Sequence, residues 1–190
     1  MNIIDVEQGS DAWFAARAGK LTASRVKALV AKTKSGYSTS RANMITQLAL
    51  ERMTKHVEQN TYTSPAMQRG TDLESEARNY YIFDRNVSVA EVGMVIHPEY
   101  DFITCSPDGL LDDDGLIEIK CPFRRKITGI PPFYYWIQVQ LQLEVCDLEF
   151  CDFVEYEFME FETKEEFINR RNKNERIIYL RKFEAPSKDS

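Results

Sequence analysis

The segment from Cys105 to Pro122 constrains this chain more than any other, because its sequence specifies strand, turn and strand in succession. It reads C-S-P-D-G-L-L-D-D-D-G-L-I-E-I-K-C-P. Apolar and charged residues alternate from Leu116 to Lys120, a pattern typical of a β-strand with two different faces. In such a strand Glu118 and Lys120 lie on one face, and two isoleucines lie on the other. The strand therefore presents an acid and a base side by side.

A tight turn before this strand is predicted by the dipeptide Asp114-Gly115, which is typical of β-hairpins. Asp108 ends the preceding β-rich run. A hairpin of this kind brings Asp108, Glu118 and Lys120 to one place. Two carboxylates and one ammonium group are then expected to face the same cleft.

These groups are the ones that metal-dependent phosphodiester cleavage uses. Hard divalent cations prefer carboxylate and carbonyl oxygens, and a bound cation neutralises phosphate charge and lowers the pKa of water. Asp108, Glu118 and the backbone carbonyl of Ile119 are the predicted ligands. Lys120 is placed to orient the attacking water or to offset developing charge. On spacing alone, a solvated hairpin face explains the same pattern.

Length and composition predict one globular domain. The chain has 190 residues and is 43% apolar, with 11 Phe and 9 Tyr, which suffices for a core. No apolar run is long enough to span a bilayer, and the first residues lack the order of a signal peptide. We therefore expect a cytoplasmic protein without a membrane partner. The four cysteines form no CxxC pair and are predicted to be reduced core residues.

Charge is segregated along the chain. The formal net charge of −6 disfavours nucleic acid as an average, because duplex binding depends on phosphate neutralisation. However, Ala12 to Leu50 contains seven basic residues and no acid, whereas Glu144 to Glu162 contains eight acids and no base. A local basic surface is therefore compatible with an acidic total.

Periodicity and capping signals predict helices alternating with strands. Helix 41–55 is expected to direct Ile45, Leu48 and Met53 to the core. The other predicted helices cover 11–18, 22–31, a segment from Ser64-Pro65 that carries Glu74, 131–145 and 163–184, the last beginning with a Thr-x-x-Glu capping box, and the predicted strands cover 86–97, 102–106, 116–121 and 150–158.

Four sequence blocks resemble one known family. They are W-x-x-x-R at Trp13–Arg17 followed by L-T-A-S at Leu21–Ser24, a glycine-then-acid helix block at Gly70–Glu76 with Tyr80, S-P-D-G-L with E-x-K-C-P at Ser106–Leu110 and Glu118–Pro122, and Y-x-x-Q-V-Q at Tyr135–Gln140. In these blocks the chain resembles the phage lambda exonuclease / YqaJ-type viral recombinase family of the PD-(D/E)XK nuclease superfamily.

The resemblance implies an α/β (α+β) fold with a PD-(D/E)XK restriction-endonuclease-like core, a central mixed β-sheet flanked by α-helices. Residues 1–190 would form a single nuclease domain. Within it, 1–60 would be a mainly helical part that binds DNA ends, 64–160 the catalytic core, and 163–184 a C-terminal helix.

The resemblance also assigns roles around the hairpin. Asp108 and Glu118 would be metal ligands, and Lys120 the catalytic lysine. Glu74 would hold a second metal or its water, and Gln138 would contact the same site. Without the resemblance, Glu74 is an exposed helix acid paired with the arginine four residues later, and Gln138 belongs to an amphipathic helix.

Arg17 and Ser24 match the family residues that hold the 5′ phosphate of the degraded strand. The physical chemistry agrees, because Ser24 lies where a helix is predicted to start and free N–H groups favour an anion there. A plain N-cap is the other interpretation of Ser24.

Further matches concern DNA contacts outside the centre. Lys34 lies in the family's basic arm, and Arg124 and Lys126 follow the E-x-K strand, where a solvated turn explains them equally well. Met67 falls near the position of an apolar wedge between strands, although a core methionine is the more common role.

The activity that the resemblance implies is a Mg²⁺-dependent 5′→3′ exonuclease, with Mn²⁺ as a possible substitute and one or two ions. Linear double-stranded DNA with a 5′ phosphate would yield 5′ mononucleotides and 3′ single-stranded tails. A homotrimer and a phage single-strand annealing protein would be its partners. Two alternatives stay open: a PD-(D/E)XK endonuclease of restriction or repair type, and a non-catalytic module that binds DNA ends.

Overall fold

The predicted hairpin turn is present and lies in the middle of a sheet, but the first strand of the hairpin begins after Asp108 instead of ending there as predicted. In the computed structural model, which describes residues 1–57, 64–112, 114–123, 125–157, 163–165 and 178–184, β8 (Gly109–Leu111) pairs antiparallel with β9 (Gly115–Lys120). Asp114 adopts a left-handed conformation with φ of 59°, which Asp tolerates better than most residues. The turn therefore forms as the Asp-Gly dipeptide predicts.

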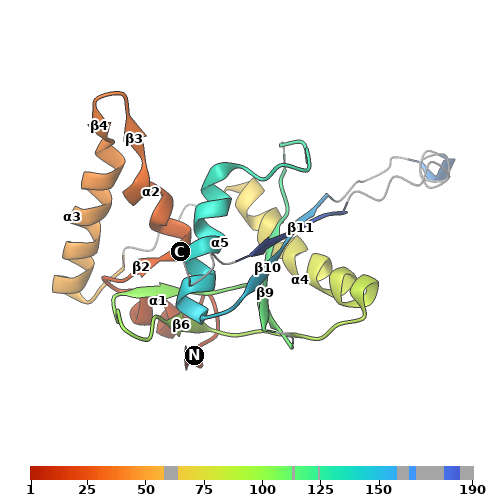
Figure 1. Cartoon of the computed structure of the whole chain (residues 1–190), viewed down its shortest axis with the longest axis horizontal. Coiled ribbons are helices and arrows are strands. Elements are labelled where there is room, and N and C mark those ends of the chain that lie inside the picture. The colour runs from red at the N-terminus through yellow and green to blue at the C-terminus, as the bar shows by residue number, and fades with distance from the viewer. Residues whose placement is uncertain (58–63, 113, 124, 158–162, 166–177, 185–190) are drawn as a thin grey trace.

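The hairpin belongs to a mixed five-stranded sheet. Its strand order is β11 (Ile178–Glu184), β10 (Phe150–Tyr156), β9, β8 and β5 (Val89–Ala90). β9 and β10 are parallel, and the other neighbours are antiparallel. Helices flank this sheet (Figure 1), so the predicted α/β fold class is confirmed.

The N-terminal residues are joined to the middle of the chain by a second sheet. It has the order β1 (Asn2–Ile4), β6 (Met94–Ile96), β7 (Ile103–Cys105) and β2 (Leu21–Thr22). A separate two-stranded ribbon, β3 (Lys32–Thr33) with β4 (Gly36–Tyr37), projects beside the body in Figure 1. The pairing of β2 with β7 carries the segment around Arg17 to the centre of the fold.

The predicted helices are present from residue 11 to residue 146. They are α1 (Asp11–Arg17), a 3-10 turn η1 (Ala23–Arg25), α2 (Val26–Val30), α3 (Thr39–Thr54), α4 (Pro65–Arg85) and α5 (Phe133–Cys146). Ser10 caps α1, because its Oγ accepts a hydrogen bond from the Trp13 N–H at 3.2 Å. Among the helices of the described residues, none is long and apolar enough to cross a bilayer.

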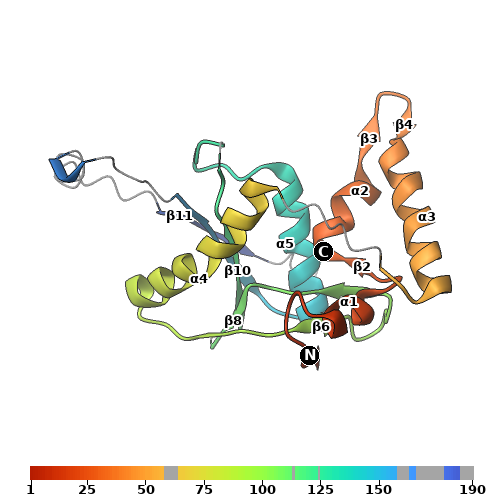
Figure 2. The same ribbon diagram turned by 180° about the vertical axis from the view of Figure 1, so that it is seen from behind.

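The two faces of the five-stranded sheet carry different helices. Leu116 and Phe153 pack with the buried face of α5, whereas Ile117 and Ile119 pack with Ala77 and its neighbours on α4. Figure 2 shows α4 and α5 from behind. The strand alternation thus puts the two isoleucines of β9 against α4 and Glu118 on the side of α5. All four cysteines are free; Cys105, Cys146 and Cys151 are buried as predicted, whereas Cys121 is half-buried.

Two sequence predictions are wrong. The predicted helix 163–184 ends in a strand, because β11 pairs with β10 over seven residues from Ile178 to Glu184; residues 166–177 lie outside the described part. In addition, α3 packs at the periphery. Ile45 is 51% and Met53 80% exposed, so neither side chain is in the core.

Gly93 lies so close to the backbone of Ile4 and Val6 that there is no room for a side chain. A Cβ atom there would lie 2.2 Å from the carbonyl oxygen of Val6 and 2.7 Å from that of Ile4. We expect Gly93→Ala to lower the free energy of unfolding by about 2–3 kcal/mol, because backbone cannot move aside as a flexible side chain can. Chemical denaturation measures the change.

Gly70, inside α4, is the matched control, since nothing lies within 4 Å of its added Cβ. Gly70→Ala should raise the free energy of unfolding by about 0.5–1 kcal/mol through helix propensity. Equal stability of the two variants would contradict this description of the β1–β6 junction.

Candidate active site

The carboxylate of Glu118 is at the centre of the site. Its residue is 1% exposed, in the middle of β9. Oε1 accepts hydrogen bonds from the Lys120 ammonium and from Gln138 Nε2, the latter at 2.6 Å. Oε2 accepts a hydrogen bond from Gln142 Nε2 at 2.7 Å. A buried carboxylate is thus satisfied by one charged and two amide donors, the two amides coming from α5.

Asp108 lies against the same strand. Its Oδ2 accepts a hydrogen bond from the backbone N–H of Ile119 at 2.6 Å. The prediction that the hairpin brings Asp108, Glu118 and Lys120 together is confirmed by these contacts. Burial, reinforced by the nearby Glu118 charge, raises the pKa of the Asp108 carboxyl well above its usual range.

Glu74 joins the cluster from α4. Arg78 Nη2 donates to Glu74 Oε1 at 2.9 Å, and Arg78 Nε donates to the backbone oxygen of Asp108 at 3.0 Å. Glu74 therefore pairs with Arg78, as its place on the helix predicts, and it also lies near the acidic centre; its part in holding a second metal or its water stays a prediction. Burial raises the pKa of Glu74, with the Glu118 charge adding to the effect and Arg78 and Lys120 opposing it.

The electrostatics of this cluster suit a divalent cation. Burial alone lowers the pKa of Lys120, but the Glu118 and Asp108 charges outweigh it and raise that pKa. Burial is the main cause of the raised pKa values of Asp108 and Glu74, and the Glu118 charge adds to it in both, so a cation between these carboxylates would stabilise their ionised forms. Hard oxygen atoms are the donors that Mg²⁺ prefers. Within the described residues, no three His, Cys, Asp or Glu side chains form a complete metal cage, so backbone carbonyl or water oxygens would have to complete the coordination.

Arg17 provides a cation at the other side of the site. Its guanidinium lies 3.8 Å from the centre of the Trp13 ring, and Nη2 donates to Thr22 Oγ1 at 3.4 Å. Burial and the neighbouring Arg25 lower the pKa of Arg17 to about 10. Ser24 lies inside η1 rather than at a helix N-cap, and its Oγ is 3.1 Å from Thr22 Oγ1. A guanidinium and a hydroxyl thus lie together where an anion would relieve the unfavourable charge.

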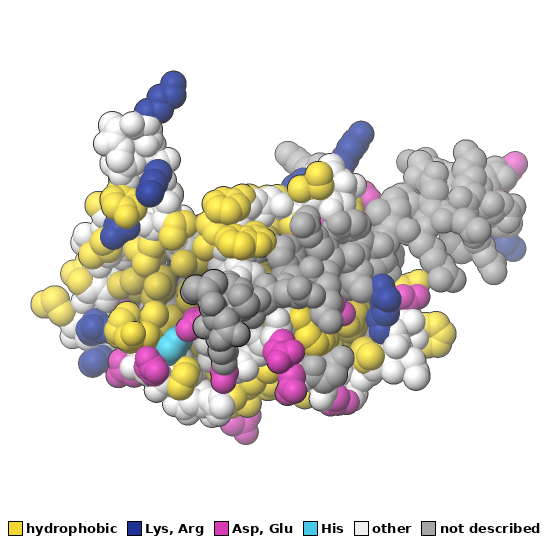
Figure 3. Space-filling model, viewed as in Figure 1, with side chains coloured by type: hydrophobic (Ala, Val, Ile, Leu, Met, Phe, Trp, Pro, Cys, Tyr) yellow, Lys and Arg dark blue, Asp and Glu magenta, His cyan; other side chains and the backbone are white. Residues whose placement is uncertain are grey.

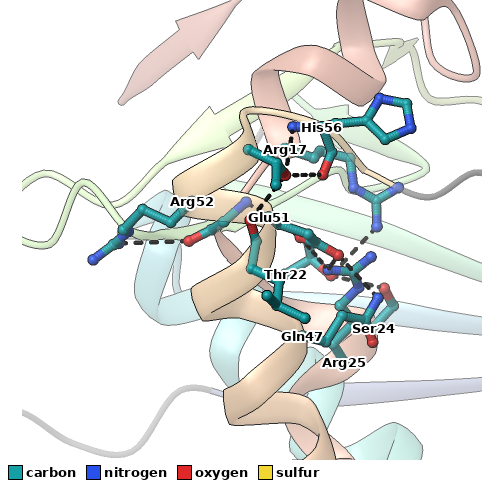
Figure 4. Close-up of polar contacts among 11 residues, drawn as sticks. Arg17, Thr22, Ser24, Arg25, Gln47, Glu51, Arg52 and His56 are labelled. Carbon is teal, nitrogen blue, oxygen red and sulfur yellow. Dashed lines mark hydrogen bonds and ion pairs between the residues drawn. The ribbon is translucent and has the colours of Figure 1, made fainter.

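A buried glutamate supports this cationic corner (Figure 4). Glu51 of α3 is 4% exposed and accepts two hydrogen bonds from Arg25 Nη1, at 3.0 and 3.1 Å. It also accepts from the N–H of Gly19 at 3.2 Å and from Gln47 Nε2 at 2.9 Å. This network joins α3 to the loop between α1 and β2, and holds Arg25 beside Arg17.

One cavity of about 190 Å³ connects the two corners. Asp108, Glu118, Lys120 and Gln138 line it together with the predicted phosphate-binding residues Arg17 and Ser24. Ser106 and Gln142 also line it, and the sequence prediction missed both. The sequence does contain a signal for Gln142, because it follows Gln138 by four residues on a predicted helix and therefore lies on the same face. Ser106 accepts a hydrogen bond from Trp13 Nε1 at 3.1 Å.

Three other predicted side chains in the described part of the chain do not line this cavity, namely Glu74, Lys34 and Lys126. Glu74 lines a neighbouring cavity together with Arg78 and Asp108. Lys34 is exposed in the turn between β3 and β4, and Lys126 is exposed in the loop before α5. Arg124 and the side chain of Met67 lie outside the described part of the structure. Arg125, between Arg124 and Lys126, forms an ion pair with the buried Glu155 of β10.

Comparison with known proteins identifies the family of this chain. Residues 12–149 match the YqaJ-like viral recombinase domain, which covers most of the sequence, including the whole cavity lining after Gln8. The chain belongs to this family. A curated relative, the uncharacterised protein R354 of Acanthamoeba polyphaga mimivirus, is 30% identical over 124 residues. That alignment covers 56% of this YqaJ-family chain but only 23% of the mimivirus protein.

Solved structures match this chain over most of its length and allow the folds to be compared. The alkaline exonuclease of Laribacter hongkongensis is 35% identical, with a TM-score of 0.74, and the match covers 93% of this chain and 83% of that one. The same exonuclease in complex with dAMP gives a TM-score of 0.73. A phage-related exonuclease of Haemophilus somnus, at 16% identity and a TM-score of 0.61 over 88% of this chain and 85% of that one, shares the fold. The fold is of the PD-(D/E)XK type, and the similarity supports a nuclease.

Gln142 tests the hydrogen bonding of Glu118. We expect Gln142→Ala to lower the free energy of unfolding by about 1–3 kcal/mol, because it leaves Oε2 of a buried carboxylate without its donor. Gln68→Ala is the matched control, since Gln68 Nε2 also donates to a carboxylate, Asp72 Oδ1 at 2.8 Å, but in an exposed position. Its cost should stay below about 0.5 kcal/mol. Similar losses in the two variants, measured by urea denaturation, would contradict the role given to Gln142.

Proposed function

We propose that this chain is a Mg²⁺-dependent 5′→3′ exonuclease that acts on linear double-stranded DNA. It would hydrolyse phosphodiesters to 5′ mononucleotides and leave 3′ single-stranded tails for recombination by strand annealing. The observation that carries the proposal is the shared cavity, in which the acid-and-lysine cluster and the Arg17–Ser24 pair line the same space. A cutting centre beside an anion-binding corner suits a substrate that is held by its terminal phosphate.

Asp108, Glu118 and the Ile119 carbonyl would hold Mg²⁺ in this proposal, with Glu74 binding a second ion or its water. When bound, the cation supplies positive charge next to the scissile phosphate and acidifies a water molecule. Lys120 keeps its proton because two carboxylates raise its pKa, and it stabilises negative charge on the phosphate. Gln138 fixes the orientation of the Glu118 carboxylate through its hydrogen bond.

The other corner would recognise the end of the strand. Arg17 and the Ser24 hydroxyl bind the 5′ phosphate, and the Trp13 ring holds the guanidinium plane in place. The crystal structure of the Laribacter exonuclease with dAMP supports a mononucleotide as a ligand of this fold. Because the two corners share one small cavity, a phosphate held at Arg17 brings an adjacent phosphodiester to Lys120.

The proposal extends to contacts outside the cavity. Lys34, Arg124 and Lys126 would bind the DNA backbone, and Met67 would act as a wedge between the strands. Figure 3 shows Lys and Arg side chains along the projecting ribbon, which agrees with a basic arm. From the family resemblance we also propose a homotrimer and a phage single-strand annealing protein as partner.

Arg17→Ala should separate end recognition from chemistry. On linear duplex with 5′ phosphates we expect its rate to fall by roughly 10- to 100-fold, the loss typical of a hydrogen-bonded charged group. On the same duplex with 5′ hydroxyl ends the variant should differ little from wild type. Single-turnover release of the labelled terminal nucleotide measures both rates. If the wild type degraded both ends equally fast, the anion-binding role of Arg17 and Ser24 would be wrong.

The activity should rise with pH over a range above that in which ordinary carboxyl groups titrate, because protonated carboxyls cannot bind a cation and the pKa values of Asp108 and Glu74 are raised. Lys120 stays charged over this range, since its pKa is also raised. More Mg²⁺ competes with the proton and should therefore shift the profile towards lower pH. Initial rates at several Mg²⁺ concentrations test this. A profile that Mg²⁺ does not move would count against carboxylate ligation.

A further inference from the structure

Aromatic side chains gather at the N-terminal end of α5. Phe133 is 72% and Trp136 42% exposed, and their rings are stacked with an interplanar angle of 11° and centroids 5.7 Å apart. Tyr134 is 39% exposed on the same turn. Figure 3 shows hydrophobic side chains over this upper end of α5, on the face towards the viewer. A cluster of exposed aromatic rings is typical of a surface that binds a ligand or a partner.

The segment that carries these rings contains no acidic residue. From Cys121 to Leu143 the sequence contains three basic residues and no Asp or Glu, although the whole chain has a net charge of −6. Lys126 is exposed in the loop before α5. A second element adds another cation, since Lys27 Nζ of α2 lies 5.2 Å from the centre of the Tyr134 ring. Flat aromatic surface interleaved with positive charge is typical of sites for single-stranded nucleic acid.

One edge of this surface, at Tyr134 and Tyr135, lies next to the candidate active site. Lys120 Nζ lies 5.5 Å from the centre of the Tyr135 ring, and the Tyr134 and Tyr135 rings are 4.4 Å apart. Gln138, which binds Glu118, is one helical turn after Tyr134 and therefore on the same side of α5. A strand leaving the cavity at Lys120 thus meets Tyr135 and Tyr134 first, and it reaches Phe133 and Trp136 only by passing around the N-terminal end of α5, because helix geometry places these two rings on the side away from Gln138.

We propose that Tyr134, Phe133 and Trp136 form a stacking site for the bases of single-stranded DNA, with Lys27 and Lys126 contacting its phosphates. The ligand would be the unpaired strand that the proposed exonuclease leaves behind, so the inference rests on the proposed function. Duplex DNA does not fit the same role, because its bases are already stacked on one another. A two-fold contact between copies is disfavoured, since it would bring the basic side chains of this surface against each other.

The test is binding without turnover. In EDTA, fluorescence anisotropy compares a 5′-labelled oligothymidine with an abasic oligonucleotide of the same length, which keeps the phosphates but lacks the bases. We expect the wild type to prefer the oligothymidine on the order of tenfold, and Phe133→Ala/Trp136→Ala to bind both ligands alike. Trp136→Phe, which keeps an aromatic ring, should retain most of the preference.

Phe83→Ala is the matched control, because Phe83 is an 85% exposed ring on α4 away from this surface, and its loss should change neither affinity. The inference is overturned if the double variant keeps the base preference, or if its only change is loss of self-association in sedimentation velocity, which would make the face an interface between copies. Nuclease activity is assayed separately with Mg²⁺. Base-dependent binding without any hydrolysis would contradict the proposed function alone, and hydrolysis without base-dependent binding would contradict this inference alone.

Discussion

Burial of the Glu118 carboxylate sets the conditions for the rest of this structure. An ionised carboxylate in a core costs several kcal/mol unless donors surround it. Lys120 comes from the same strand, whereas Gln138 and Gln142 come from α5. Both amides reach the carboxylate only if α5 packs on β9 at one position along the strand and with one rotation about the helix axis. The apolar contacts of Leu116 and Phe153 with α5 stabilise the same arrangement. The need to satisfy one charge therefore fixes the geometry of the site.

A second constraint brings distant parts of the sequence to that charge. β2 pairs in parallel with β7, which places Thr22 beside Thr104 and carries Arg17 and Ser24 to the edge of the cavity. Glu51 then fastens this segment to α3 through Arg25 and the Gly19 N–H. The cationic corner thus depends on buried polar contacts rather than on apolar packing. Such contacts are sensitive to the loss of any one partner, because the remaining groups stay buried.

Local patterns in the sequence were sufficient for the hairpin and for the cluster of Asp108, Glu118 and Lys120, because turn chemistry and strand alternation act over a few residues. These patterns failed where the secondary structure is determined by pairing between distant segments. The charged segment ending at Glu184 has a helix-like start, but its last residues form β11 because β10 offers an open edge. The Gln142 contact and the Glu51 network needed the packing of α5 and α3, which periodicity alone does not specify.

The most direct test compares a linear duplex with a covalently closed circle of the same sequence, with Mg²⁺ or with EDTA. If the cavity combines a Mg²⁺ centre with end recognition, the linear duplex loses nucleotides from its 5′ ends and keeps 3′ tails, while the circle stays intact. EDTA or Lys120→Ala should stop the reaction. Rapid linearisation of the circle would show an endonuclease instead, and a linear duplex that stays intact in Mg²⁺ would contradict a catalytic role for this site.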